Sequence, residues 1–324
     1  MMKFKLDFDV PQSENKISHE NRILLLGSCF SENIGNHLAL NKFDTAINPF
    51  GTLYNPSSIF QMLSLAIDDN HSPTFFRHNE LWRCWHAHSK ISGITKIEVQ
   101  EKYEIALAQV RDFIVTGDWI VVTPGTSMVY THKASGQVVA NCHTVPQQTF
   151  SKSMLEVKTI VSDFVKLRSK IQRINPDLKW IFTVSPVRHI RDGLIANTRS
   201  KSRLVEAIHQ ISENHEHTFY FPSYEILIDE LRDYRFYAND LIHPSPQAVE
   251  FIWEKFAASF IDDNGLKFIH DWTSLRSAMN HSSLNPNSAA HQKFLMNTIN
   301  KLEELSVKVD VKQEIAALKT LLNG

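Results

Sequence analysis

Two stretches of the sequence carry residues that could do covalent chemistry, and the first is the tripeptide Gly27-Ser28-Cys29. It follows an apolar run and precedes a segment with a helical pattern. A side chain at such a strand-to-helix turn lies where the helix amides and dipole favour negative charge. We therefore expect a lowered pKa for the Cys29 thiol, which would make Cys29 a nucleophile. The alternative is that Ser28 caps the helix and Cys29 packs as a small apolar side chain.

The second stretch is YANDLIHPSPQA, residues 237–248, in which Asp240 precedes His243 by three positions. On a turn, both side chains can reach one point, so that the carboxylate orients the imidazole as a base. The alternative is that Asp240 caps the following helix and His243 is an ordinary surface histidine. The pair gains weight because it follows the last predicted strand of the same region.

Further polar residues are expected around the same crevice. Asn141 and His143 end a predicted hairpin, and Arg188 and His189 follow a predicted strand. Each pair could hold an anionic or polar substrate, or could simply stabilise turns. The chain has 16 histidines but lacks HExxH and the spacing of a structural zinc site, so no metal is predicted. It also lacks a glycine-rich phosphate loop, so no cofactor is predicted.

A parallel sheet would bring these residues together. Short apolar runs stopped by Gly or Pro predict buried strands, and the amphipathic segments between them predict helices. The predicted strands are residues 22–26, 43–51, 119–125, 179–186 and 218–224, and the predicted helices are 152–173, 201–213 and 246–260. This alternation predicts an α/β fold with a doubly wound, mostly parallel sheet flanked by helices. Ligands of such sheets bind beyond the carboxyl ends of the strands.

The chain is expected to divide near residue 265. An α/β domain spans 1–265, and a helical C-terminal appendage spans 266–324, with one helix over 289–322. Within the first domain, residues 127–141 predict a β-hairpin, and the aromatic and histidine-rich stretch 70–95 predicts an inserted subregion or lid.

Composition argues against several classes of protein. Lys and Arg number 34 against 35 Asp and Glu, so nothing favours binding to nucleic acid. No apolar run is long enough for a membrane span, and the first residues do not resemble a secretory signal. Three cysteines without a CxxC pair argue against a disulfide framework. They favour the reducing cytoplasm as the location.

A nucleophile after the first strand and a DxxH motif after the last resemble the layout of SGNH (GDSL-type) hydrolases. The resemblance is closer to one branch, the GSCFA family, whose Gly-Ser-Cys-Phe-Ala motif here reads Gly27-Ser28-Cys29-Phe30-Ser31. Other segments look like the same family: NPFGTLYNP (48–56), TPGT (123–126), NCHTVP (141–146), TVSPVRH (183–189) and NDLIHPS (239–245).

The resemblance implies roles for individual residues. Aligned on Gly27, the nucleophile of GDSL-type enzymes falls on Cys29, and Asp240 and His243 match their Asp-His pair. Gly51 matches the block whose N–H helps to form the oxyanion hole. The block that supplies an Asn side chain is not matched, because Gly125 and Thr126 stand there. Thr126, Asn141 or the Cys29 backbone is left to complete the hole, and Gly125 is a further candidate for oxyanion or substrate binding.

The sequence thus predicts an SGNH-like hydrolase acting on an acyl ester of a small molecule or saccharide, with Cys29 or Ser28 as nucleophile. Two alternatives stay open. One is an acyltransferase that passes the acyl group to a saccharide or another polar acceptor. The other is a ligand-binding protein without catalytic activity on the same fold.

Overall fold

The computed structural model describes residues 6–7, 9–68, 73–279, 288–306 and 309–323. Its centre is a five-stranded parallel sheet with the order β11-β10-β6-β1-β2. The strands are β1 (Arg22–Gly27), β2 (Asp44–Ile47), β6 (Trp119–Thr123), β10 (Lys179–Phe182) and β11 (Thr218–Tyr220). All five lie in the predicted runs. The order reverses between β1 and β6, which is where ligands of doubly wound sheets bind.

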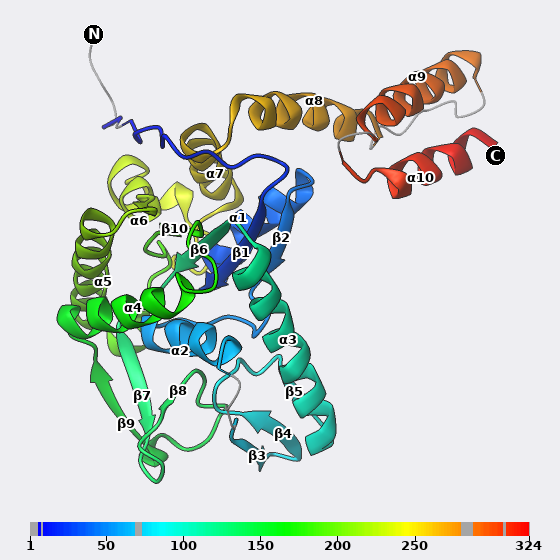
Figure 1. Ribbon diagram of the computed structural model, residues 1–324. Coiled ribbons are helices and arrows are strands. Elements are labelled where there is room, and N and C mark those ends of the chain that lie inside the picture. Colours follow the sequence, from blue (N-terminus) through cyan, green and yellow to red (C-terminus); the bar gives the residue numbers. More distant parts are fainter. Residues whose placement is uncertain (1–5, 8, 69–72, 280–287, 307–308, 324) are drawn as a thin grey trace.

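Helices cover both faces of this sheet, as predicted (Figure 1). Because side chains alternate along a strand, Ile23 and Leu25 of β1 pack on one face and Leu24 and Leu26 on the other. The first face is covered by α1 (Cys29–Leu40) and α7 (Pro246–Phe260), and the second by α2 (Pro56–Ala66), α3 (Lys96–Thr116), α4 (Val157–Ile171) and α5 (Leu194–Asn214). The predicted α/β fold class is confirmed.

Short helical turns complete the loops at the strand ends. They are α6 (Ser223–Glu225), which runs into a π-helical turn (Ile226–Glu230), and 3-10 turns at Gln147–Thr149, Ile190–Asp192 and Tyr234–Phe236.

Two small antiparallel sheets lie together at one end of the molecule, beyond α2 (Figure 1). They are β3 (Phe75–His78), β4 (Leu81–Cys84) and β5 (Ser92–Gly93), and β7 (Met128–His132), β8 (Val138–Val139) and β9 (Phe150–Met154). Trp85, Val139 and Phe150 form a small apolar cluster between them, which we call the wall cluster. The hairpin predicted over 127–141 is present as β7 and β8.

Two helix boundaries differ from the prediction. Residues 152–156 are not helical, because Phe150–Met154 pairs with β7 along five residues, and this strand pairing outweighs the local helical pattern. The helix predicted over 201–213 begins earlier, at Leu194, after Gly193 with φ of 82°.

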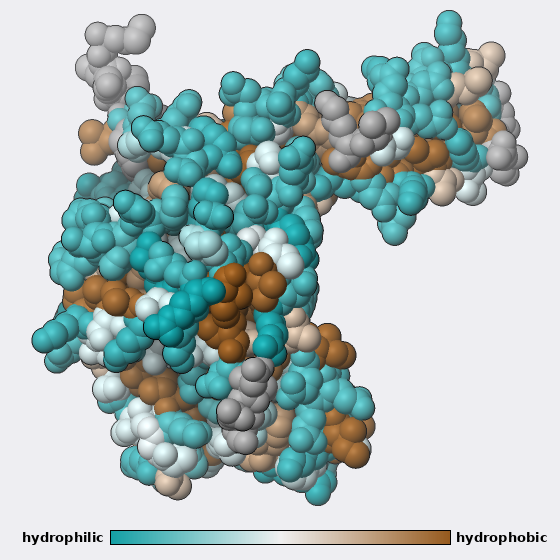
Figure 2. Space-filling model, viewed as in Figure 1, coloured by the Kyte–Doolittle hydropathy of each residue, from teal (hydrophilic) through white to brown (hydrophobic). Residues whose placement is uncertain are grey.

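Three C-terminal helices form an arm that extends from the body beside α7 (Figure 1). They are α8 (Asp263–Met279), α9 (Ala289–Leu305) and α10 (Lys312–Asn323), with an apolar cluster of their own. The single helix predicted over 289–322 is wrong, since the Asp310 carboxylate accepts the Lys312 N–H and starts a new helix. On the face shown in Figure 2, most of the surface is hydrophilic, and hydrophobic residues appear where α8 meets the other arm helices.

The arm packs on the body of its own chain through Trp272. This side chain is buried, and its indole N–H donates to the Leu40 carbonyl at the end of α1 (2.8 Å). Nearby, the Lys42 ammonium pairs with Glu314 of α10 (2.5 Å). None of the helices in the described ranges combines the length and apolarity that a membrane crossing needs.

Replacing Trp272 by alanine should loosen the arm. We expect a loss of about 3–5 kcal/mol in the free energy that holds α8 in place, because a large buried ring and its hydrogen bond are removed. The measurement is limited proteolysis, with faster cleavage within residues 263–323. Met296→Ala, on an exposed position of α9, is the control. Equal cleavage of the two variants would contradict this account of the joint.

Candidate active site

The Gly27-Ser28-Cys29 segment forms the tight turn between β1 and α1. The Ser28 N–H donates to the Thr123 carbonyl at the end of β6 (2.9 Å), which fixes the turn at the point where the strand order reverses. Ser28 is the N-cap of α1, and its hydroxyl accepts the Phe30 N–H (3.3 Å). Cys29 is the first residue of the helix. The capping role weighed for Ser28 is therefore confirmed.

Burial distinguishes the two candidate nucleophiles. Ser28 is 1% exposed and its hydroxyl is engaged in capping, whereas Cys29 is half-buried and packs against the apolar cluster of α1 and α7, as the alternative for this residue expects. Burial, and after it the negative charge of Glu32, raises the pKa of the Cys29 thiol. The expected lowering is wrong, because these two effects outweigh the N–H groups of Cys29 and Phe30 that point at the sulfur.

Asp240 and His243 form a close, exposed pair on the loop before α7. The Asp240 Oδ2 lies 2.6 Å from His243 Nδ1, and its Oδ1 accepts the N–H groups of Ile242 and His243 (2.9 and 3.0 Å). The backbone and side-chain hydrogen bonds from His243 lower the pKa of Asp240 to about 2. Ser245, not Asp240, caps α7. The carboxylate therefore fixes the ring through Nδ1 and leaves Nε2 for other chemistry.

His243 has no hydrogen bond at Nε2 within the described part of the chain, and no hydrogen bond there joins the Cys29 thiol to this ring. The His243 side chain is 49% exposed, so it is accessible to a ligand.

His189 and Tyr54 lie between the β1–α1 turn and the Asp240–His243 pair. The centres of their rings are 5.2 Å apart. A Cβ built on Gly125 would lie 3.4 Å from the Ser28 Cβ and 3.8 Å from His189 Nε2, so Gly125 brings this ring close to the β1–α1 turn. Burial, then the charge of Lys201, lowers the pKa of His189 to about 4, and His243 adds to the lowering. His189 is therefore neutral near pH 7 and a poor base.

Two predicted oxyanion donors are engaged elsewhere. The Gly51 N–H donates to the Asn48 carbonyl (2.7 Å), and the Gly125 N–H donates to the Tyr54 carbonyl (2.8 Å). A role for Gly51 or Gly125 at an oxyanion stays a prediction, and it requires these bonds to break.

The side-chain candidates differ in availability. The Thr126 hydroxyl bonds the Ser200 hydroxyl (3.0 Å) and accepts the Met128 N–H (3.0 Å). The Asn141 Oδ1 accepts the His143 N–H (2.7 Å), while its Nδ2 donates to none of the described residues. Asn141 Nδ2 is therefore the side-chain donor among these candidates that is available to a substrate oxygen.

A cavity of about 410 Å³ opens between Tyr54 and His189 on one side and the second small sheet, β7–β9, on the other. Its lining includes Tyr54, Thr126, Asn141, Cys142, His143 and His189. His143 is held in place by the Cys84 carbonyl (2.7 Å), and burial lowers its pKa to about 4. The volume is in the range of small-molecule sites, and aromatic and amide groups can orient a polar ligand there.

Arg188 lies outside this cavity. Its guanidinium is 5.2 Å from the centre of the Tyr237 ring, and both residues line a smaller hollow of about 300 Å³. The structure therefore separates the predicted neighbours Arg188 and His189 into two hollows.

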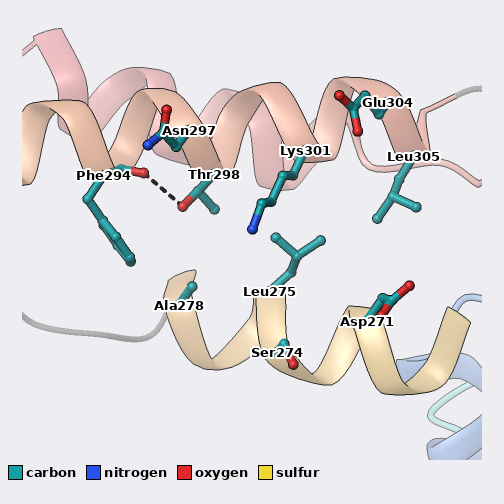
Figure 3. Close-up of a pocket in the computed structure, with 10 residues that line it drawn as sticks. All are labelled: Asp271, Ser274, Leu275, Ala278, Phe294, Asn297, Thr298, Lys301, Glu304 and Leu305. Carbon is teal, nitrogen blue, oxygen red and sulfur yellow. Dashed lines mark hydrogen bonds between the residues drawn. The ribbon is translucent and has the colours of Figure 1, made fainter. Parts of the chain in front are cut away.

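The arm holds a cavity of similar size, about 500 Å³, shown in Figure 3. Leu275 of α8 and Lys301 and Leu305 of α9 point into the gap between the helices (Figure 3). Its lining has no cysteine or histidine, and its Ser274 and Thr298 hydroxyls donate to helix carbonyls. This cavity therefore offers no nucleophile with a base.

Sequence reasoning missed three buried polar residues of α5: Asn197, Ser200 and Lys201. They continue the buried apolar stripe of Leu204, Ala207, Ile208 and Ile211 with the same helical spacing. Polar residues that extend an apolar stripe toward a strand end are the signal that could have revealed them. Among the described residues, no three His, Cys, Asp or Glu gather closely enough to hold a metal ion.

Two solved structures show only a loose likeness. One, from Clostridium thermocellum, is a family two carbohydrate esterase in complex with cellohexaose, with 14% identity and a TM-score of 0.37 over 81% of this chain and 67% of that one. The other is an acetyl xylan esterase from the rumen bacterium Butyrivibrio proteoclasticus, with 15% identity and a TM-score of 0.26 over 48% of this chain and 38% of that one.

A comparison with curated proteins finds no match. At the family level, the model described as the GSCFA family matches residues 22–256. A second model, the GSCFA domain protein, C-terminal domain, matches residues 272–324. Together these two matches cover the α/β body and most of the arm. The chain therefore belongs to the GSCFA family.

Proposed function

We propose that the protein is a hydrolase of acyl esters in which Cys29 is the nucleophile and His243, oriented by Asp240, is the base. One observation carries this proposal. A half-buried thiol at the β1–α1 turn and a carboxylate-oriented imidazole on the loop before α7 each interact with a residue that lines the cavity of about 410 Å³, Cys29 with Tyr54 and His243 with His189. Nucleophile, base and orienting carboxylate are the parts that acyl transfer needs.

The raised pKa of Cys29, which burial and Glu32 cause, decides how the reaction starts. The sulfur carries its proton in the resting protein, so a base must remove it. His243 Nε2 takes this proton when the ester is bound, and the thiolate forms a bond to the acyl carbon. The charge on the carbonyl oxygen is held by the Cys29 N–H and by Asn141 Nδ2.

The intermediate then breaks down in two steps. The bond to the leaving alcohol breaks, and the alcohol oxygen receives the proton from His243, which leaves a thioester on Cys29. Water gives a proton to His243 and attacks the thioester, the acid departs, and the sulfur regains its proton. An acceptor hydroxyl in place of water would make the same protein an acyltransferase onto a saccharide or another polar acceptor.

The test is to trap the acyl group on the protein. Wild-type protein is mixed with p-nitrophenyl acyl esters and acetylated sugars, and the mass of the intact chain and of its peptides is followed. We expect an adduct on Cys29, no adduct in Cys29→Ala, and a retained adduct in Ser28→Ala. Free acid as product indicates the hydrolase, and an acylated alcohol indicates the acyltransferase.

Other outcomes identify the alternatives. An adduct on Ser28 would replace Cys29 as nucleophile. Binding of the esters without adduct or product would favour the ligand-binding protein. Labelling by iodoacetamide gives an independent check. Burial raises the pKa of Cys84 to about 12, so the Cys84 thiol should react much more slowly than the Cys29 thiol.

A further inference from the structure

Lys201 of α5 is a buried lysine without an acidic partner among the described residues. It is 1% exposed, and its ammonium donates to the Ser185 carbonyl just beyond β10. It forms no ion pair with any residue in the described ranges. Burying an ammonium without a counter-charge is unfavourable. A lysine at such a position therefore indicates a functional role rather than a contribution to folding.

The groups that face Lys201 come from other elements. His189 follows β10, and the Tyr224 ring of α6 has its centre 5.8 Å from the ammonium. A chain of backbone contacts leads from Lys201 to the residue before Cys29. Ser185, which accepts from Lys201, donates its N–H to the Pro124 carbonyl (3.0 Å), and a Cβ built on the next residue, Gly125, would lie 3.4 Å from the Ser28 Cβ. His189 is neutral near pH 7, because burial and Lys201 lower its pKa to about 4. Burial, and after it Glu225 and other acidic groups, raise the pKa of Tyr224 despite the opposing charge of Arg188. The thiolate of Cys29 is therefore the negative charge that can form next to this ammonium.

Cys29 in turn faces three charged or titratable groups. Glu32 is on its own helix, Tyr54 is in the loop after β2, and Lys201 comes from α5. Glu32 opposes a thiolate and Lys201 supports one. Burial lowers the pKa of Lys201 to about 7, and a charge on Cys29 raises it again, so the two groups stabilise each other's charged forms.

We propose that Lys201 is a positioning residue of the site, whose buried ammonium holds the negative charge on the Cys29 sulfur once the thiol proton has left. This inference rests on the proposed role of Cys29 as nucleophile. It gives a reason for the burial of the polar stripe of α5 against the loops after β6 and β10, and it gives the thiolate a partner against burial and Glu32.

The experiment measures alkylation of Cys29 by iodoacetamide from pH 6 to pH 9, followed by peptide mass. It compares wild type with Lys201→Met, which fits the buried space, and Lys201→Gln, which keeps a donor for the Ser185 carbonyl. Lys166→Met makes the same chemical change on an exposed side chain and is the control. Thermal unfolding of each variant is recorded in parallel.

At pH 7.5 we expect alkylation to slow roughly tenfold in both Lys201 variants, which corresponds to about 1.4 kcal/mol in thiolate stability. The rate–pH profile should move to higher pH, and the control should match wild type. The Tm of Lys201→Met should not fall, because an apolar side chain replaces a buried amine that has no acidic partner.

An unchanged pH profile in either folded variant would overturn the proposal, whatever happens to the Tm. Failure of both variants to fold would also overturn it, because a lysine needed for folding requires no role at Cys29. These readouts use no ester substrate. They therefore stay separate from the acyl-trapping test, in which an absent adduct on Cys29 would reject the proposed function itself.

Discussion

Gly27→Ala is expected to unfold the protein or to remove more than about 4 kcal/mol from its free energy of unfolding. Gly27 has φ of 145°, and an added Cβ would lie 2.3 Å from the Thr123 carbonyl oxygen. That oxygen belongs to the backbone of the neighbouring central strand and accepts the Ser28 N–H (2.9 Å), so it cannot give way without opening the sheet. Chemical denaturation followed by circular dichroism is the measurement.

Gly136→Ala is the matched control for this prediction. Gly136 also has positive φ, 69°, but no atom lies within 4 Å of its added Cβ. Only the backbone preference opposes the change there, which costs about 1 kcal/mol. If Gly27→Ala were as stable as Gly136→Ala, the turn that carries Ser28 and Cys29 would not be as tight as the structure has it.

His243→Ala should lower kcat for ester hydrolysis roughly 100- to 10 000-fold, the usual contribution of a positioned base. The effect should be large because the raised pKa of Cys29 leaves the sulfur protonated without a base. Asp240→Asn should lose less than His243→Ala, since the ring remains but its orientation and tautomer are no longer fixed. Initial rates with the best ester from the acyl-trapping panel provide the measurement.

His270→Ala is a suitable control, because His270 also sits beside an aspartate, Asp271, at 3.2 Å, but on the exposed surface of the arm. Equal rates for His243→Ala and wild type would reject His243 as the base. A larger loss in His189→Ala than in His243→Ala would transfer the role to His189, despite its pKa near 4.

The Asp240–His243 pair also predicts how the rate of ester hydrolysis depends on pH. Hydrogen bonds from His243 lower the pKa of Asp240 to about 2, so the stabilising charge is present above its ordinary range and is lost only as the pH falls toward 2. Protonation of Asp240 should therefore not limit the rate between about pH 4 and 8. Any acid limb of the rate profile in that window must belong to another group.

The sequence was sufficient for the features that depend on local pattern. The five buried strands, the hairpin at residues 127–141 and the helix over 246–260 follow from apolar runs and from Gly and Pro stops. The capping by Ser28 and the contact between Asp240 and His243 follow from short spacings in the chain.

Features that depend on distant contacts could not be read in this way. Residues 152–154 belong to a strand because β7 lies beside them, although their pattern predicts the start of a helix. The pKa of Cys29 depends on burial by the folded core and on Glu32, which outweigh the helix terminus. Lys201 lies near Cys29 only because β10 and α5 fold back on β1. No sequence spacing between positions 29 and 201 predicts this proximity.

The wall cluster has a consequence for how the family can diversify. The cavity of about 410 Å³ is bounded on one side by Met128, Tyr130 and Val139 of the second small sheet, and Val139 packs in the wall cluster, whose contacts are separate from the two clusters that hold the central sheet. Substitutions in β7, β8 and β9 can therefore reshape this side of the cavity with little loss of stability in the α/β scaffold. Members that accept different molecules should diverge first at these strand residues, while the turn at Gly27, residues 141–146 and the loop at Asp240 stay the same.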